Sequence, residues 1–188
     1  MTLPMPVLIQ RASPHCDERP AGEHISLLVI HNISLPAGSF AAKPEHSYVD
    51  ALFMGTLDCS AEPGFDSLQG VRVSAHCVIW RDGSIFQYVP FAKRAWHAGV
   101  SQFTGRERCN DFSIGIELEG TDNLPYTEAQ YQSLIQLTSY LCQQYPAITP
   151  ERIAGHCDIA PGRKTDPGAA FDWQRYLTAV KSALKSAQ

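Results

Sequence analysis

The 188-residue sequence lacks any apolar run near the roughly 20 residues that a membrane-spanning helix requires. It also lacks an excess of positive charge, since 15 lysines and arginines face 19 aspartates and glutamates and leave a net charge of −4. This balance argues against a general nucleic-acid-binding protein. Prolines and charged residues interrupt the first twenty residues, which do not read as a basic start followed by an apolar stretch, so we expect no signal peptide.

Paired cysteines are lacking as well. None of the six cysteines forms a C-x-x-C pair, and in a chain of this length without a secretion signal we expect reduced, mostly buried thiols. No internal repeat or low-complexity tract divides the chain. With 44% hydrophobic and 18% charged residues, the composition predicts one globular domain over residues 1–188, with a core from about 13 to 180. We expect a cytoplasmic monomer that contacts neither nucleic acid nor membrane.

Strand patterns are clear in four places. Residues 27–30 form a continuous apolar run that ends at His31, as expected of a strand buried on both faces. Residues 72–80 alternate in polarity, and the Asp82-Gly83 pair then predicts a hairpin turn before a returning strand at 85–89. Residues 112–119 also alternate, which places Glu117 and Glu119 on the face opposite the apolar side chains. From the pattern alone, both are equally well read as ordinary exposed strand carboxylates.

Three helices are predicted. Thr127 followed by Gln130 is a capping-box start, and apolar residues then repeat at helical spacing until Pro146. Asp172 can cap a C-terminal helix, and a weaker helix over 48–54 stops at Gly55. Strands interleaved with helices, together with a hairpin, predict a single α/β domain with a central mixed sheet flanked by helices.

Two histidines stand out from the other five. His31 and His156 each follow a short apolar strand pattern and precede a loop rich in proline and glycine. Ligand groups tend to lie at such strand ends. Asp166 lies in the second of these loops, where Pro167 restricts its backbone. Two imidazoles and a carboxylate suit zinc with a fourth position left for water, although Cys157 and Asp158 are rival donors beside His156.

The remaining histidines carry more ordinary interpretations. His15, His24 and His46 lie among loop-forming residues and are expected to be solvated. His76 and His97 are both candidates to line a pocket, and the pattern does not decide between them.

Six blocks of the sequence resemble one family, in order and with nearly the same separations. They are LLVIHNISLP at 27–36, VSAHC at 73–77, RAWHAGVS at 94–101, NDFSIGIELEGT at 110–121, GHCDIAP at 155–161 and RKTDPG at 163–168. Over residues 13–176 the chain thereby resembles the cytosolic N-acetyl-anhydromuramyl-L-alanine amidases of the AmpD type. Residues 41–47 match no pattern of that family, which leaves the role of the loop at 36–47 open.

The resemblance implies a mixed sheet flanked by helices, with zinc in a groove at the strand ends. It implies zinc-dependent hydrolysis of the amide between the lactyl group of 1,6-anhydro-N-acetylmuramic acid and L-alanine, on small muropeptides from cell-wall recycling. The family's metal ligands fall on His31, His156 and Asp166, its catalytic acid/base on Glu117 and its transition-state cation on Lys164. Loss of such an activity would raise β-lactamase expression, because the uncut fragments act as inducers.

The elementary chemistry agrees with these roles. Zinc can lower the pKa of water from about 15.7 to about 7, which is on the order of 12 kcal/mol toward hydroxide. A general base alone contributes roughly 3–5 kcal/mol, so the metal should generate the nucleophile while Glu117 moves protons. Substrate carboxylates suit arginine forks, and the resemblance favours Asn32, Arg72, Trp96 and Arg108 as substrate-binding residues.

Three alternatives remain at this point. A peptidoglycan-binding module without activity would be expected to lack a ligand, and this chain keeps all three together with Glu117 and Lys164. A cysteine hydrolase would use Cys157 or Cys77 beside a histidine, although side chains of adjacent residues diverge in an extended segment. A secreted amidase would act on intact wall.

Overall fold

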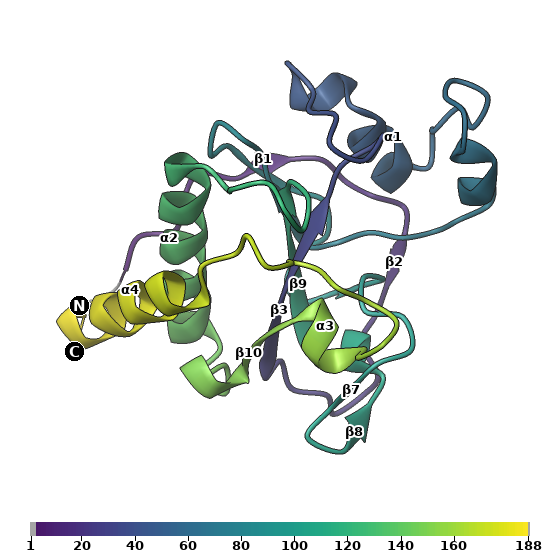
Figure 1. The fold of residues 1–188 in the computed structure, drawn as a ribbon. Coiled ribbons are helices and arrows are strands. Elements are labelled where there is room, and N and C mark those ends of the chain that lie inside the picture. The colour runs from purple at the N-terminus through teal and green to yellow at the C-terminus, as the bar shows by residue number, and fades with distance from the viewer. Residues whose placement is uncertain (1–2, 188) are drawn as a thin grey trace.

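A six-stranded mixed sheet forms the centre of the computed structural model, which describes residues 3–187 (Figure 1). Its strand order is β1-β5-β4-β9-β3-β10. Only β4 and β5 are antiparallel, joined by the hairpin at Asp82-Gly83, and the other neighbours are parallel. The strands are β1 (Ile9–Gln10), β3 (Leu27–Ile33), β4 (Cys77–Ile79), β5 (Ile85–Gln87), β9 (Ser113–Glu119) and β10 (Ile153–Gly155).

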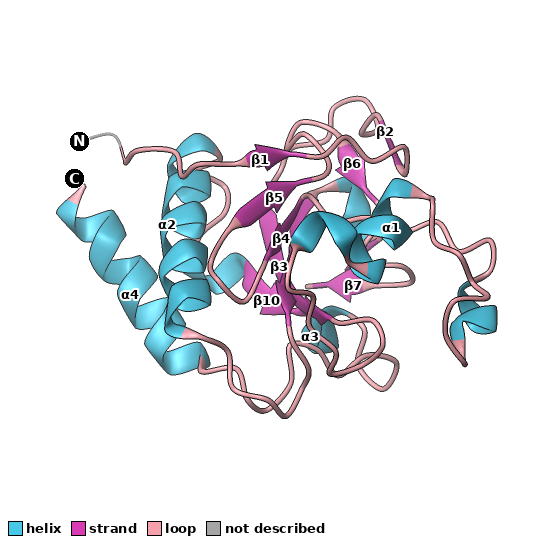
Figure 2. Ribbon diagram, turned by 90° about the horizontal axis from the view of Figure 1, so that it is seen from above, coloured by secondary structure: helices cyan, strands magenta, loops and turns pink. Residues whose placement is uncertain are grey.

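Helices cover the sheet from both sides. Figure 2 shows α2 and α4 packed together on one side, with α1 and α3 on the other. The helices are α1 (Tyr48–Met54), α2 (Glu128–Gln144), α3 (His156–Ile159) and α4 (Trp173–Ser186). Two small antiparallel pairs complete the strands, β2 (Cys16–Asp17) with β6 (Arg94–Ala95) and β7 (Gln102–Phe103) with β8 (Arg106–Glu107). Within residues 3–187, none of these helices has the length and apolar character to cross a bilayer.

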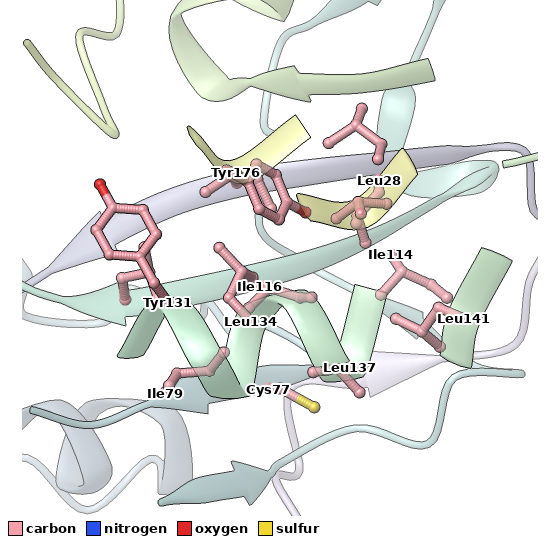
Figure 3. Packing of buried hydrophobic residues seen from close by; sticks show 14 of the residues in the cluster. Leu28, Cys77, Ile79, Ile114, Ile116, Tyr131, Leu134, Leu137, Leu141 and Tyr176 are labelled. Carbon is pink, nitrogen blue, oxygen red and sulfur yellow. The ribbon is translucent and has the colours of Figure 1, made fainter. Parts of the chain in front are cut away.

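The largest apolar cluster lies between the sheet and the α2–α4 pair (Figure 3). Alternate residues of β3 and β9, such as Leu28 and Ile116, meet Leu134 of α2 and Tyr176 of α4, and all four side chains are fully buried. Burying one such side chain contributes roughly 1.5–3 kcal/mol. Because strand side chains alternate between faces, the intervening residues of β3 and β9 point to the opposite face. His31 and Glu117 are among them.

The local signals for the helices are confirmed. Thr127 Oγ1 accepts a hydrogen bond from Gln130 N at 3.1 Å, and Gln130 Oε1 accepts one from Thr127 N at 3.0 Å, which is the capping box expected at the start of α2. Asp172 caps α4, and α1 ends at Gly55 with φ 71°. All six cysteines are free thiols, of which Cys77, Cys109 and Cys142 are buried and the other three are half-buried.

The predicted strand boundaries need correction. The strand expected over 72–80 is regular only at Cys77–Ile79, because Ser74 N and His76 N donate to carbonyls of residues 96 and 115 outside a continuous ladder. The strand expected to end at His31 continues to Ile33, paired in register with β9. His156 does not close a strand but opens α3, so the predicted loop after it begins with one helical turn.

Candidate functional site

Three side chains from distant parts of the chain meet on the face of the sheet opposite α2 and α4. His31 Nδ1 lies 3.0 Å from His156 Nδ1 and 3.1 Å from Asp166 Oδ2, and His156 Nδ1 lies 3.2 Å from the same oxygen. His31 and His156 are almost fully buried, and the Asp166 side chain is 13% exposed. The structure thus brings together the three residues that the sequence singled out as metal ligands.

The parallel pairing of β10 with β3 explains how the two histidines meet. Gly155, the last residue of β10, stands opposite Ile30, so the residues that follow on each strand, His31 and His156, lie at the same edge. The loop that carries Asp166 returns to this edge because Cys157 N donates to Asp166 O at 3.0 Å. The Pro167 carbonyl accepts a further hydrogen bond from Tyr126 Oη at 2.7 Å, which ties the loop to the segment between β9 and α2.

The protonation states of the cluster favour a cation. Burial lowers the pKa of His31 to about 4, so the ring is neutral at neutral pH. Burial would raise the pKa of Asp166, but the contacts with His156 and His31 outweigh it and hold that pKa below its ordinary value. A neutral imidazole at His31 and an ionised carboxylate at Asp166 are the forms that bind a metal ion.

The donor geometry fits a metal ion. The Ala98 carbonyl can only accept, so His156 Nε2, 3.1 Å away, carries the proton and leaves the Nδ1 lone pair facing Asp166. His156 Nδ1 and Asp166 Oδ2 are then both acceptors, and a cation between them turns repulsion into attraction. Ligand atoms about 2.0–2.1 Å from a tetrahedral metal lie about 3.3 Å apart, close to the 3.0–3.2 Å separations here. The cluster is therefore compatible with a metal site.

Glu117 lies beside this cluster. It stands directly opposite His31 in the β3–β9 register, and neighbouring strands are about 4.7–4.9 Å apart. The alternative of an exposed strand carboxylate is wrong, because the residue is only 8% exposed. Its Oε2 atom is buried with no hydrogen-bond partner among the described residues. Burial, with the charge of Asp166, raises the pKa of Glu117 well above its ordinary value, so the carboxyl is able to hold a proton.

Lys164 is the cation nearest in sequence to the third ligand. Its side chain is exposed, and its backbone N–H donates to Ala160 O at 3.0 Å. The charge of Lys164 lowers the pKa values of both His31 and Glu117, although burial acts more strongly on each of them. The role of Lys164 in the reaction stays a prediction.

The four predicted substrate-binding residues are not gathered at one place. Asn32 donates from Nδ2 to Asp122 Oδ1 and to the Pro167 carbonyl, so part of its side chain supports the Asp166 loop. Trp96 donates to Asp17 and stacks on His15, and Arg72 lines a separate pocket that also contains His15. Arg108 lines a surface depression of about 500 Å³ together with Arg163. Their substrate roles stay predictions.

Two further histidines are buried, and a third is half-buried beside the cluster. His15, predicted to be solvated, is 8% exposed and packs against Trp96, so that prediction is wrong. His76 is fully buried, with Nδ1 accepting from Gly115 N and Nε2 facing the Lys93 carbonyl, so it is a satisfied core residue. His97, the other pocket candidate, lies beside the cluster, with its Nδ1 2.9 Å from His31 Nε2. The sequence pattern gave no sign of this contact with a candidate ligand.

Neither rival donor nor rival nucleophile takes part in the cluster. Asp158 Oδ2 accepts from Gly155 N at 2.7 Å and so caps α3. Cys77 is fully buried, and burial raises the pKa values of both Cys77 and Cys157. Raised thiol pKa values oppose the thiolate form that a cysteine hydrolase needs.

A mixed sheet flanked by helices, with a buried His–His–Asp cluster beside a carboxyl group, is the architecture of a protein compatible with a metal centre. The sequence profile described as N-acetylmuramoyl-L-alanine amidase matches residues 21–169, and the chain belongs to this family.

Several named proteins and solved structures are similar to this chain. The 1,6-anhydro-N-acetylmuramyl-L-alanine amidase AmpD of Salmonella typhimurium is 62% identical over 168 residues, which cover 89% of this chain and 87% of the relative. A crystal structure of a Se-Met AmpD derivative superposes with a TM-score of 0.87 at 60% identity, over 92% of this chain and 94% of that one. A complex of the amidase AmiD from Escherichia coli with the substrate anhydro-N-acetylmuramic acid-L-Ala-D-gamma-Glu-L-Lys has a TM-score of 0.60 at 30% identity, over 86% of this chain and 60% of that one.

Proposed function

We propose that this protein is a zinc-dependent hydrolase that cleaves the amide between the lactyl group of 1,6-anhydro-N-acetylmuramic acid and L-alanine in small muropeptides. The observation that carries the proposal is the buried His31–His156–Asp166 cluster with Glu117 beside it on the next strand. Similarity to the AmpD relatives supports the choice of bond and of the anhydro sugar. Two imidazoles and one carboxylate suit zinc and leave a position open for catalysis.

The proposed roles divide the chemistry among these residues. Bound zinc supplies a Lewis acid that activates water and polarises the amide carbonyl. Glu117 takes a proton from the attacking water and returns it to the leaving nitrogen of L-alanine. Lys164 offsets the negative charge that develops on the carbonyl oxygen. The products are the anhydromuramic acid and a free peptide.

The proposal extends to substrate contacts and domain organisation. Arg108 and Arg163 share the depression beside α3, where guanidinium groups suit peptide carboxylates. Asn32, Arg72 and Trp96 remain proposed contacts for the rest of the muropeptide. We assign a single amidase domain to residues 1–188, acting as a monomer. One chain supplies all three metal donors, Glu117 and Lys164, which supports that assignment.

The proposed setting is cell-wall recycling in the cytoplasm. Six free cysteines are consistent with a reducing compartment, and the AmpD relatives act on the anhydro sugar named in their description. Loss of the activity should then leave uncut fragments and raise β-lactamase expression.

Product analysis tests the function. The zinc-loaded protein is incubated with anhydro-N-acetylmuramyl-tripeptide, and mass spectrometry is expected to find the free tripeptide and the sugar acid. The same peptide on ordinary N-acetylmuramic acid serves as the specificity control. A chelator should abolish cleavage and added zinc restore it, whereas a thiol reagent should leave it intact. Absence of both bound zinc and cleavage would overturn the proposal in favour of a binding module.

A further inference from the structure

One short backbone segment contacts both histidines of the metal cluster. His97 Nδ1 lies 2.9 Å from His31 Nε2, and the carbonyl of the next residue, Ala98, lies 3.1 Å from His156 Nε2. In each case the contact is made with the ring nitrogen that faces away from Asp166. The segment therefore reaches both ligands from behind.

The direction of these hydrogen bonds follows from what each atom is able to do. When Nδ1 of His31 binds a metal, its Nε2 carries the proton and donates to His97 Nδ1. His97 must then accept at Nδ1 and hold its own proton on Nε2, which lies 3.1 Å from Ser113 Oγ. Ala98 O accepts from His156. The segment thus selects, for both ligands, the tautomer whose Nδ1 lone pair faces the centre.

The segment is itself held in place by Asn110. Asn110 Oδ1 accepts from His97 N at 3.1 Å and from Ala98 N at 2.8 Å. A single side-chain oxygen thereby fixes the two residues that contact the two ligands. Ala98 is fully buried, and its carbonyl also accepts from Arg163 Nη2 at 2.7 Å.

The absence of a side chain at residue 115 makes room for the His97 ring. A Cβ atom placed on Gly115 would lie 2.4 Å from His97 Cγ and 2.5 Å from its Nδ1, far inside contact distance. Gly115 lies in β9 with ordinary extended backbone, so its lack of a side chain has a packing reason rather than a conformational one. The ring lies against the sheet between His31 and Ser113.

We propose that the His97–Ala98 segment, held by Asn110, is the positioning element that sets the tautomer and orientation of both histidine ligands. This inference rests on the proposed metal centre. Removal of a hydrogen-bond partner of this kind typically lowers metal affinity about 10–100-fold. His97 and Asn110 are positioning residues, since both act through His31 and His156.

Two matched pairs of variants test the proposal. H97L removes the acceptor, and H97N keeps an acceptor oxygen near the position of Nδ1. N110L removes the oxygen that holds the segment, and N110D keeps it without altering the His97 ring. H15F is the control, because His15 is a buried histidine bonded to a backbone carbonyl outside this network.

Zinc affinity is measured by competition with a chromogenic chelator, and ligand geometry by the visible spectrum of the Co²⁺-substituted protein. H97L and N110L are expected to weaken zinc binding about 10–100-fold and to alter the cobalt spectrum. H97N, N110D and H15F should stay within a few-fold of the wild type. If H97L does not fold, the two Asn110 variants decide the question.

Two outcomes contradict the proposal in distinguishable ways. If the wild type binds zinc and both leucine variants bind it equally well with an unchanged cobalt spectrum, the positioning role is wrong while the proposed function stands. If the wild type binds no zinc, the metal centre fails and this role fails with it.

Discussion

Replacing Glu117 with glutamine separates proton transfer from metal binding. The E117Q variant keeps the size of the side chain and removes its ability to accept and return a proton. Glu117 is outside the three-donor cluster, so zinc affinity should stay within a few-fold of the wild type. General acid–base catalysis contributes about 10²–10⁴-fold, so turnover should fall by that factor, equivalent to roughly 3–5 kcal/mol in the barrier.

The same substitution should leave the fold at least as stable. Glu117 is 8% exposed, its Oε2 has no hydrogen-bond partner among the described residues, and burial raises its pKa. An ionised carboxylate is therefore unfavourable at this place in the metal-free protein, and the neutral amide avoids that cost. We expect the melting temperature of metal-free E117Q to equal or exceed that of the wild type.

Glu119 provides a matched control on the same face of β9. Its two carboxylate oxygens accept from Ala41 N and Arg81 N, so it supports the structure rather than the chemistry. E119Q should lower the melting temperature and keep most of the turnover per bound zinc. Steady-state cleavage of an anhydro-muropeptide, metal content and thermal unfolding are measured for both variants. Turnover of zinc-loaded E117Q within tenfold of the wild type would refute the assigned role.

Three other substitutions probe the ligand, the loop and the pH response. D166A should lose zinc and activity together, and retention of stoichiometric zinc by metal analysis would contradict the ligand assignment. G168A should lower the free energy of unfolding by roughly 1–3 kcal/mol in chemical denaturation. Gly168 has a φ of +80°, and a Cβ there would lie 2.1 Å from Asp122 Cα. Unchanged stability and zinc affinity would count against this packing of the Asp166 loop. Hydrogen bonds from Arg94 lower the pKa of Asp17 below its ordinary 3.8, so their stabilisation is present above that pH and is lost as the pH falls below it. D17N removes this carboxylate, so its free energy of unfolding should fall less than that of the wild type as the pH is lowered below 3.8. Parallel curves of unfolding free energy against pH for the two proteins would refute the expectation.

The sequence predicted those helix ends that depend only on residues close together in the chain. The capping box of Thr127 and Gln130, the Asp172 cap and the Gly55 stop all act within one turn of helix, so sequence spacing was sufficient. The strand expected over 72–80 was wrong in extent because its backbone partners come from residues 96 and 115. Polarity alternation describes which residues are buried and does not reveal where their backbone groups are bonded.

The sequence pattern also did not predict which residues at the site are buried. Glu117 and His76 both alternate with apolar residues, which is also typical of a half-exposed strand. Both are buried by residues distant in sequence, which include Lys93 and His97 at His76 and His31 at Glu117. The solvated interpretation of His15 failed for a similar reason, because Trp96 stacks on its ring.

The sequence by itself determined the family and the α/β class. Residue type limits which atoms are able to bind a metal, and the family resemblance then selected His31, His156 and Asp166 over rival donors such as Cys157. Only the tertiary structure decided that His31, His156 and Asp166 meet within 3.2 Å, since parallel pairing of β3 with β10 joins segments 125 residues apart. It also decided that His97 and Ala98 contact the ligands from behind. Those contacts depend on a ring packed against Gly115 in three dimensions, and no periodicity along the chain encodes that approach.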